Sequence, residues 1–268
     1  MVAPTCQRRG DRDLCLCRRV GGWTGAALKA TFEGGKVSGV KTPVADGGIA
    51  GLAVVLVNSG GKPALALVEL DQAGVTRTKL DSFDQLRAHY TVRFDGATAE
   101  LLNGPTAGQA IDRLFDRAAV QAAFEAVGGA EACLTMARDY ALDRQIFGRA
   151  LAGYQAIKHK LADILVGVEL ARSNAYYAAW AAENAADELP LAASAARLTA
   201  IGAFENAARE NIQVHGGIGY TFEANCHFYY RRERTLALSL GGREPWANRL
   251  IANIPGAQAQ GNLQAEAA

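Results

Sequence analysis

A glycine-rich segment beside a histidine has residue types and a spacing that could do chemistry. Residues 213–223 read QVHGGIGYTFE, in which His215 precedes Gly216, Gly217 and Gly219. Residues without Cβ let the backbone adopt positive φ, or let another group approach the main chain. The spacing matches neither the GxGxxG of dinucleotide folds nor the GxxxxGK of P-loops. Two interpretations stay open: a helix that ends in a tight glycine turn, or a cradle for a ligand.

A second segment combines a cation, an aromatic ring and a glycine break. Residues 140–158 read YALDRQIFGRALAGYQAIK, where Arg144 and Phe147 precede the break and Gln155 opens the next helical pattern. Arginine presents a planar cationic fork that suits phosphates. A structural interpretation of Arg144 is also open, because a cation near a helix C-terminus is favourable without any ligand.

Other catalytic patterns are absent from the sequence. There is no Glu-x-x-His pair for a di-iron site and no GxSxG nucleophile elbow, and Cys133 and Cys226 lie in no recognisable Cys-His arrangement. Glu205 and Glu210 are candidates for a general base, but solvated helix charges are the favoured interpretation. The CxC at residues 15–17 lacks a second pair of zinc ligands, so we expect no metal site.

The composition excludes several classes of partner. Lys plus Arg number 28 and Asp plus Glu 27, which gives a formal charge of +1 and no general electrostatic attraction for nucleic acid. The cluster Arg231, Arg232 and Arg234 could contact anions, although a solvated helix face is the favoured interpretation. No apolar run reaches the ~20 residues of a membrane-spanning helix. The arginine-rich start lacks the apolar region of a secretory signal, and the five cysteines are an odd number, so we expect a cytoplasmic protein without disulfides.

The chain divides by its residue patterns into four segments. We expect an irregular head over 1–22, a β domain over 23–104, a helical bundle over 105–255 and a disordered tail over 256–268. The β domain contains short runs rich in Val, Thr and Leu that are broken by turn residues, with Gly60-Gly61 as a hairpin turn. This pattern predicts an α+β fold, in which a small antiparallel barrel or sandwich precedes an antiparallel four-helix bundle.

Helical spacing defines the elements of the predicted bundle. The expected ranges are Ile111 to Gln145, Tyr154 to Ala186, Pro190 to His215, His227 to Arg234 and a last turn from Pro245 to Ile254.

Together the two motifs resemble the C-terminal half of an acyl-CoA dehydrogenase. DRQIFGRALAGYQAIKHKLADI and QVHGGIGYTFE occur in that order, two helices apart, and GGKVSGVKTPVADGGIAGLAVV is similar to the middle barrel of that family. The likeness extends over about residues 23–254. It implies FAD as cofactor, α,β-desaturation of an acyl-CoA, an electron-transferring flavoprotein as acceptor and a dimer-of-dimers assembly.

The resemblance also implies roles for individual residues. Arg144, Phe147 and Gln155 would contact an FAD bound mainly by the neighbouring subunit. Across the same interface, Gln213, Gly216 and Gly217 would face the adenosine diphosphate half. The family's flavin loop would contribute Gly242. The resemblance assigns no chemical role to His215.

The base that the family reaction requires is missing from its expected positions. Ungapped counting from GGIGYTFE places Leu240 where the family has its catalytic glutamate, and Gln145 occupies the family's alternative position. Neither side chain can accept a proton at neutral pH. Glu244 is a weak candidate for a displaced base, since it matches a position associated with the flavin loop.

The segment that precedes residue 23 also departs from the family pattern. It does not resemble the helical domain that normally precedes the barrel, so either a truncated gene start or an unusual natural subunit would explain it. Two hypotheses follow. The chain is an FAD-dependent subunit that forms a homodimer or tetramer, or pairs with a catalytic homologue in a heterotetramer, as some members acting on steroid acyl-CoAs do. Alternatively, it is a non-catalytic remnant or scaffold that oligomerises through the bundle without FAD.

Overall fold

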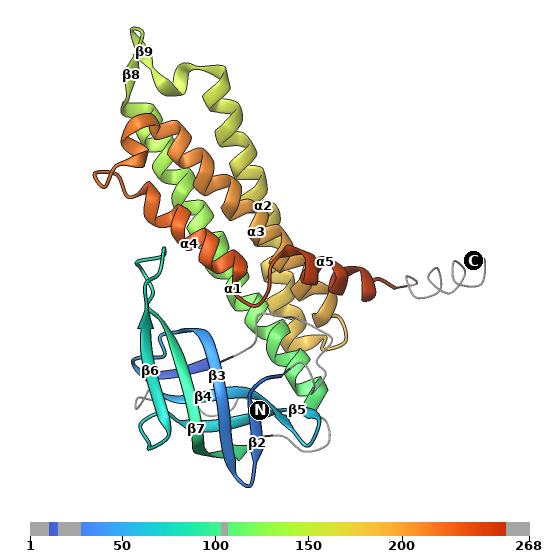
Figure 1. The fold of residues 1–268 in the computed structure, drawn as a ribbon. Helices are drawn as coiled ribbons and strands as arrows, with labels where there is room; N and C mark the ends of the chain where they lie inside the picture. The colour runs from blue at the N-terminus through green and yellow to red at the C-terminus, as the bar shows by residue number, and fades with distance from the viewer. Residues whose placement is uncertain (1–10, 16–27, 103–106, 256–268) are drawn as a thin grey trace, which may run out of the picture. The chain divides into compact units, whose positions relative to one another are not determined.

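The computed structural model describes the backbone of residues 11–15 and residues 28–102 and 107–255. These residues form a β unit and a helical unit, which divide after Ile111 (Figure 1). The predicted α+β organisation is confirmed, while the predicted disordered tail and most of the predicted irregular head lie outside the described residues.

The β unit is a small sheet that closes on itself. Its strands are β1 Asp11–Cys15, β2 Thr31–Glu33, β3 Lys36–Ala45, β4 Ala50–Ser59, β5 Lys62–Glu69, β6 Val75–Leu80 and β7 His89–Leu101. The order is β1-β4-β2-β3-β7-β5, and β6 pairs with β7. An additional pairing of β4 with β5 closes the ring. All pairings are antiparallel except those of β4 with β1 and with β2.

The β4–β5 hairpin shows why these residues form a barrel. Gly60 and Gly61 have φ of 58° and 81°, as a tight two-residue turn requires, and Ser59 pairs with Lys62. The predicted hairpin is therefore confirmed. Buried residues follow at every second position of both strands and fill the barrel: Ala53, Val55, Val57, Ala64, Ala66 and Val68.

Strand β1 is a correction to the predicted irregular head. The sequence indicated no regular element in residues 1–22, but Asp11–Cys15 pair in parallel with Ala50–Val55 of β4. A segment of five residues is too short to show a recognisable alternation of apolar and polar side chains. Their hydrogen bonds come from a strand far along the chain, which a local pattern cannot reveal.

Five helices make up the helical unit in the described part of the chain. They are α1 Ala107–Asp143, α2 Gln155–Asn184, α3 Leu189–His215, α4 Cys226–Leu238 and α5 Arg243–Ala252. The three long helices agree with the prediction, but α1 ends before Gln145, which pairs with Ala150 in a small hairpin. Both α4 and α5 start earlier than predicted. No described helix has the length and apolarity needed to cross a membrane.

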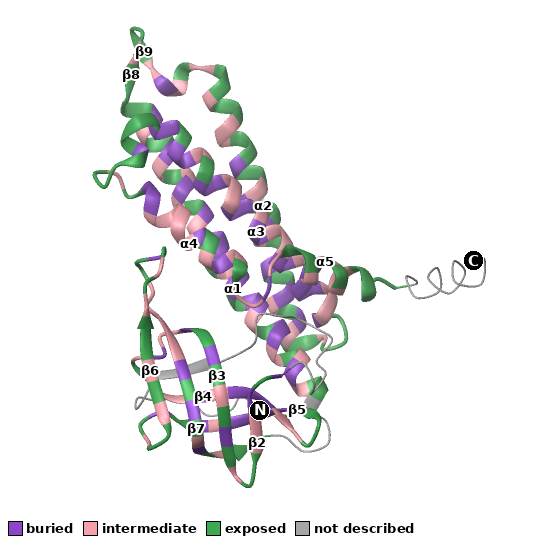
Figure 2. Ribbon diagram, viewed as in Figure 1, coloured by how far each residue is buried: buried purple, intermediate pink, exposed green. Residues whose placement is uncertain are grey.

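Helix α3 is the centre of the bundle. Buried residues, mostly alanine, occur along its whole length (Figure 2), as expected for a helix covered on most sides. It packs against α2, α4 and α5. Its contact with α1 depends on Gly129, because a Cβ there would stand 2.4 Å from Cζ of Phe204.

An ion pair fastens α5 to the start of α1. Arg249 donates from Nε and Nη2 to the two carboxylate oxygens of Asp116 at 3.0 and 2.7 Å, and from Nη1 to Asp112 at 3.3 Å. Burial raises the pKa of the Asp116 carboxyl, and the Arg249 guanidinium opposes this effect. The Arg249 guanidinium therefore offsets the cost of removing the Asp116 carboxylate from water.

Arg249→Ala should lower the free energy of unfolding by about 3–5 kcal/mol, because it leaves the buried Asp116 carboxylate unpaired. Urea denaturation at neutral pH measures the loss. Arg138→Ala is the matched control, since Arg138 pairs with Asp139 at the surface and its loss should cost under about 1 kcal/mol. Adding Asp116→Asn to Arg249→Ala should recover part of the stability. Equal losses for the two arginine variants would contradict the proposed role of the pair.

Candidate functional site

The connection between α1 and α2 is a tight hairpin that exposes an aromatic ring. Strands β8 Gln145–Ile146 and β9 Arg149–Ala150 pair across Phe147 and Gly148, whose φ values are 48° and 79°. Positive φ is uncommon for a residue with a Cβ, and here it follows from the two-residue turn. The Phe147 side chain is 96% exposed. The RQIFG segment therefore presents a ring to solvent from a fixed backbone.

Local contacts hold this hairpin on the start of α2. The Tyr154 hydroxyl donates to the carbonyl of Ile146 at 3.0 Å, and the backbone N–H of Leu151 donates to the carbonyl of Arg144 at 2.7 Å. The Arg149 guanidinium lies 3.8 Å from the centroid of the Tyr154 ring. These bonds define the path of the chain from Arg144 to the first residue of α2, Gln155.

The glycine run ends α3 and leaves its backbone open. Gly216 has φ 63° and caps the helix through its N–H, which donates to the carbonyls of Ile212 and Gln213. The interpretation of the segment as a glycine-ended helix is thus confirmed. A Cβ on Gly216 or Gly217 would meet nothing within 4 Å, and both residues are exposed. Another molecule can therefore approach the main chain at this point.

A small apolar cluster brings the two motifs together at one end of the bundle (Figure 1). Val214 at the end of α3 packs with Ala137 and Ala141 of α1 and with Leu151, which follows the hairpin. Beside this cluster the rings of Tyr140 and His215 stack with centroids 4.2 Å apart. The sequence placed the motifs in order along the chain, and the structure places them side by side.

His215 has a structural role in this cluster. It is 8% exposed, and its Nδ1 lies 2.8 Å from the carbonyl of Asn211. The histidine of the glycine run is therefore a packing residue. The predicted cofactor contacts at this end of the bundle are all exposed: Arg144, Phe147, Gln155, Gln213, Gly216 and Gly217.

The electrostatics of this end favour an anion near the hairpin. The end of α3 is its C-terminus, where the helix dipole presents partial negative charge, so α3 itself does not attract a phosphate. Helix α2, by contrast, begins here with a positive N-terminus and has no acidic residue in its first turn. Arg144 and Arg149 add two exposed cations. The arrangement suits a ligand that carries both phosphates and planar rings.

The loop Ser239–Gly242 joins α4 to α5 and contains no carboxylate. Leu240 has φ 58°, a conformation that costs a residue with a Cβ of the order of 1 kcal/mol unless its surroundings impose it. Two bonds impose it: the Trp246 indole donates to the carbonyl of Leu240 at 3.0 Å, and Arg197 donates to the carbonyl of Ser239 at 2.7 Å. Gly242 is the N-cap of α5.

The two expected base positions lie far apart within the bundle. Gln145 is exposed in β8, whereas Leu240 follows the 13 residues of α4, which extend over about 20 Å. Glu244 is exposed in the first turn of α5. The structure therefore brings together the predicted cofactor contacts of the α1–α2 connection and the glycine run, with Gln145 in the same hairpin, and leaves Leu240 and Gly242 outside that group.

The other charged candidates connect helices to one another. Arg232 pairs with Glu125, Arg234 with Glu205, and Lys160 with Glu210. The interpretation as solvated helix charges is wrong for Glu210 and Arg232, whose side chains are only 14% and 15% exposed. Glu205 and Arg234 are more exposed, and the sequence could not identify the partner of any of these groups. Sequence reasoning missed Val214 and Tyr140, whose only signal was an apolar side chain in a helical pattern.

Comparison with known proteins identifies relatives for both the sequence and the fold. Residues 108–254 match the family described as "Acyl-CoA dehydrogenase, C-terminal domain". Acyl-CoA dehydrogenase IpdE2 of Mycobacterium tuberculosis is 41% identical over 119 residues, which are 44% of this chain and 36% of the relative. IpdE2 of Mycolicibacterium smegmatis is 32% identical over 182 residues, 68% of this chain and 56% of the relative. The chain thus spans less than two thirds of the length of either relative.

Solved structures extend the likeness over most of the chain. A variant of the Tcur3481–Tcur3483 steroid ACAD has a TM-score of 0.80 and 26% identity, over 92% of this chain and 68% of that one. The ChsE4–ChsE5 complex from Mycobacterium tuberculosis has a TM-score of 0.78 and 24% identity, over 90% of this chain and 65% of that one. The second likeness concerns the fold alone.

Gly216→Ala should lower the free energy of unfolding by about 1–3 kcal/mol, because an alanine would be forced into a conformation that suits glycine. Gly217→Ala is the matched control, since Gly217 lacks the positive φ and has open space around it, and its effect should stay within about 1 kcal/mol. Urea denaturation of the two variants measures the difference. Equal effects would show that α3 does not end as described.

Proposed function

The chain belongs to the acyl-CoA dehydrogenase family, and from this premise we propose that it is an FAD-binding subunit of an acyl-CoA dehydrogenase that depends on a catalytic partner. The proposed reaction is α,β-desaturation of an acyl-CoA thioester, for which FAD would supply the hydride-accepting chemistry. The observation that carries the proposal is the meeting of an arginine-bearing hairpin and an open glycine backbone at one end of the bundle.

The exposed groups at this end fit FAD in their chemistry. FAD carries two phosphates and two planar ring systems, and the site offers cations, an exposed aromatic ring and amide side chains. Arg144 would bind a phosphate or a ring edge, and Phe147 would pack on a ring. Gln155 and Gln213 would donate hydrogen bonds, while Gly216 and Gly217 leave the space that close approach to the backbone requires. On this proposal Gly242 contacts the flavin from its separate loop.

The catalytic base has to come from the partner chain. Leu240 and Gln145 cannot take the α-proton. Glu244 is exposed in the first turn of α5, at a position that the family resemblance associates with the flavin loop. This chain would then bind and orient the cofactor across the interface, and the partner would hold the proton acceptor. An electron-transferring flavoprotein would collect the electrons.

The proposed partner and substrate class rest on analogy with the relatives. One neighbour is a steroid ACAD, and another is a complex of two different chains, ChsE4 and ChsE5. By analogy we propose a heterotetramer with a homologous subunit, in place of a homodimer or homotetramer, acting in the cytoplasm. The acyl group would be a steroid side chain or a fatty acyl chain.

Gly217→Ala should lower the affinity for FAD at least about tenfold while it changes the free energy of unfolding by less than about 1 kcal/mol, because a methyl group would occupy the space that the cofactor approaches. Isothermal titration of the co-expressed complex with FAD, after removal of the bound flavin, measures the affinity. Gly108→Ala is the control, because Gly108 is exposed, has open space around it and lies at the far end of α1. Unchanged affinity in Gly217→Ala would contradict the site.

The isolated chain should show no turnover with an acyl-CoA and an artificial electron acceptor, because it lacks a base. The complex with a catalytic homologue should turn over, and Glu244→Gln should leave its kcat within about twofold. Turnover by the isolated chain that Glu244→Gln abolishes would overturn the assignment of the base to the partner.

A scaffold function is the second candidate, and the outer face of α2 favours it. Apolar side chains there are about half exposed at helical spacing: Val166, Leu170, Tyr177 and Trp180. Such a face can support assembly without any cofactor. A colourless, folded oligomer purified from a flavin-replete host, alone and with its partner, would favour the scaffold over the flavoprotein.

A further inference from the structure

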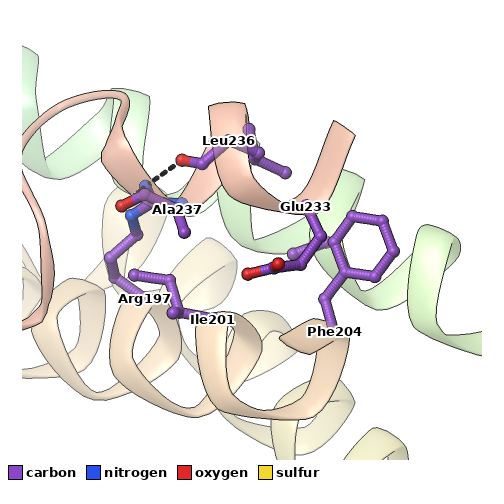
Figure 3. A pocket seen from close by; sticks show the side chains of 7 residues that line it. Arg197, Ile201, Phe204, Glu233, Leu236 and Ala237 are labelled. Atoms are coloured by element: carbon purple, nitrogen blue, oxygen red, sulfur yellow. Dashed lines mark hydrogen bonds between the residues drawn. The ribbon is translucent and has the colours of Figure 1, made fainter. Parts of the chain in front are cut away.

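Two buried ionisable side chains face the same small hollow inside the bundle. Arg197 of α3 is 0% exposed and Glu233 of α4 is 1% exposed, and both line a hollow that is too small for a water molecule. Figure 3 shows the Glu233 carboxylate turned into this space, with Ile201 between it and Arg197. The other lining residues are apolar: Ala126, Phe204, Leu236 and Ala237.

Arg197 has only part of its hydrogen-bonding capacity satisfied. Its Nη2 donates to the carbonyls of Leu236 and Ser239 at the C-terminal end of α4. A cation is also favourable there, because it lies at the negative end of the helix dipole. Its Nε and Nη1 have no hydrogen-bond partner. Burial lowers the pKa of Arg197 to about 10, so the guanidinium stays charged at neutral pH.

Glu233 has no hydrogen bond to either carboxylate oxygen. Its Oε2 lies 2.8 Å from Nε of Arg234 as an ion pair. Burial raises the pKa of the Glu233 carboxyl to about 7, against the opposing charge of Arg234. Its carboxyl is therefore neutral in mild acid and ionised in mild base.

The charged groups that act on the pair come from α1, α3 and α4. Arg234 stands beside Glu233 on α4, and Glu205 of α3 raises the pKa of Glu233 further by repulsion. Glu125 of α1 acts on Arg197 and is itself paired with Arg232. Nε and Nη1 of Arg197 have no hydrogen-bond partner, and the hollow that Arg197 and Glu233 both line is too small for a water molecule.

We propose that Arg197 and Glu233 form a proton-linked pair that sets the conformation of the loop Ser239–Gly242. When Glu233 releases its proton to solvent, the buried carboxylate attracts the Arg197 guanidinium. The guanidinium moves away from the carbonyls of Leu236 and Ser239. The loop then loses one of the two bonds that hold Leu240 at positive φ, and the remaining bond comes from Trp246.

Trp246 supplies a direct probe of this change, because its indole N–H donates to the carbonyl of Leu240. We would label tryptophan indoles with ¹⁵N in the full chain and follow the Trp246 N–H resonance by NMR from about pH 5.5 to pH 8.5. The resonance should titrate with a midpoint near the Glu233 pKa of about 7. Glu233→Gln should abolish the titration, because an amide of the same shape cannot ionise.

Matched variants separate this pair from its neighbours. Glu205→Gln should move the midpoint to lower pH, because it removes the repulsion on Glu233. Glu210→Gln removes another carboxylate of α3, one paired with Lys160, and should leave the midpoint unchanged. His227→Asn removes a nearby imidazole of α4 and should also leave it unchanged. The exposed Trp180 of α2 gives an internal reference signal.

Three outcomes would overturn the proposal. The first is a wild-type Trp246 resonance that moves no more than that of Trp180 over this range, and this test needs no variant to fold. The second is a titration that persists in Glu233→Gln. The third is a titration that His227→Asn removes. None of these readouts depends on FAD, so they test the proposal about the pair whether or not the chain is a flavoprotein.

Discussion

The packing of Val214 against Ala137, Ala141 and Leu151 is the contact on which the candidate site depends. It brings the end of α3 to the connection between α1 and α2, and the stack of Tyr140 on His215 reinforces it. Alanine matters at two of these positions because a larger side chain would separate the helices. Without this contact the arginine hairpin and the open glycines would be two unrelated surface features.

Helix α3 connects this packing contact to the rest of the bundle. Its alanine-rich surface allows close contact on several sides, and Gly129 of α1 accepts the Phe204 ring where any side chain would clash. Arg197, in the same helix, holds the carbonyls at the end of α4 and the loop that contains Leu240. One helix therefore supports both the glycine turn at one end and the loop where the family has its base.

Much of the fold could be predicted from the sequence, because local patterns determine it. Gly60-Gly61 defined a hairpin, and helical spacing located α1, α2 and α3. Strand β1 could not be predicted, since its hydrogen bonds come from β4. The structural role of His215 depends on Tyr140 across the bundle, and Arg232 and Arg234 are paired with glutamates on other helices. The spacing of residues along the chain does not reveal these contacts between helices. It also does not reveal Glu233, because only its burial distinguishes this residue from a surface carboxylate.

In the proposed assembly, the α1–α2 hairpin and the glycine turn form one half of an FAD site. Hydrogen exchange of this chain within the complex, measured with and without FAD, tests this claim most directly. FAD should slow exchange at the exposed backbone of residues 144–148 and 216–218 together, and leave the far end of α1 unchanged. Slower exchange in the partner chain alone, or at neither segment of this chain, would contradict the account.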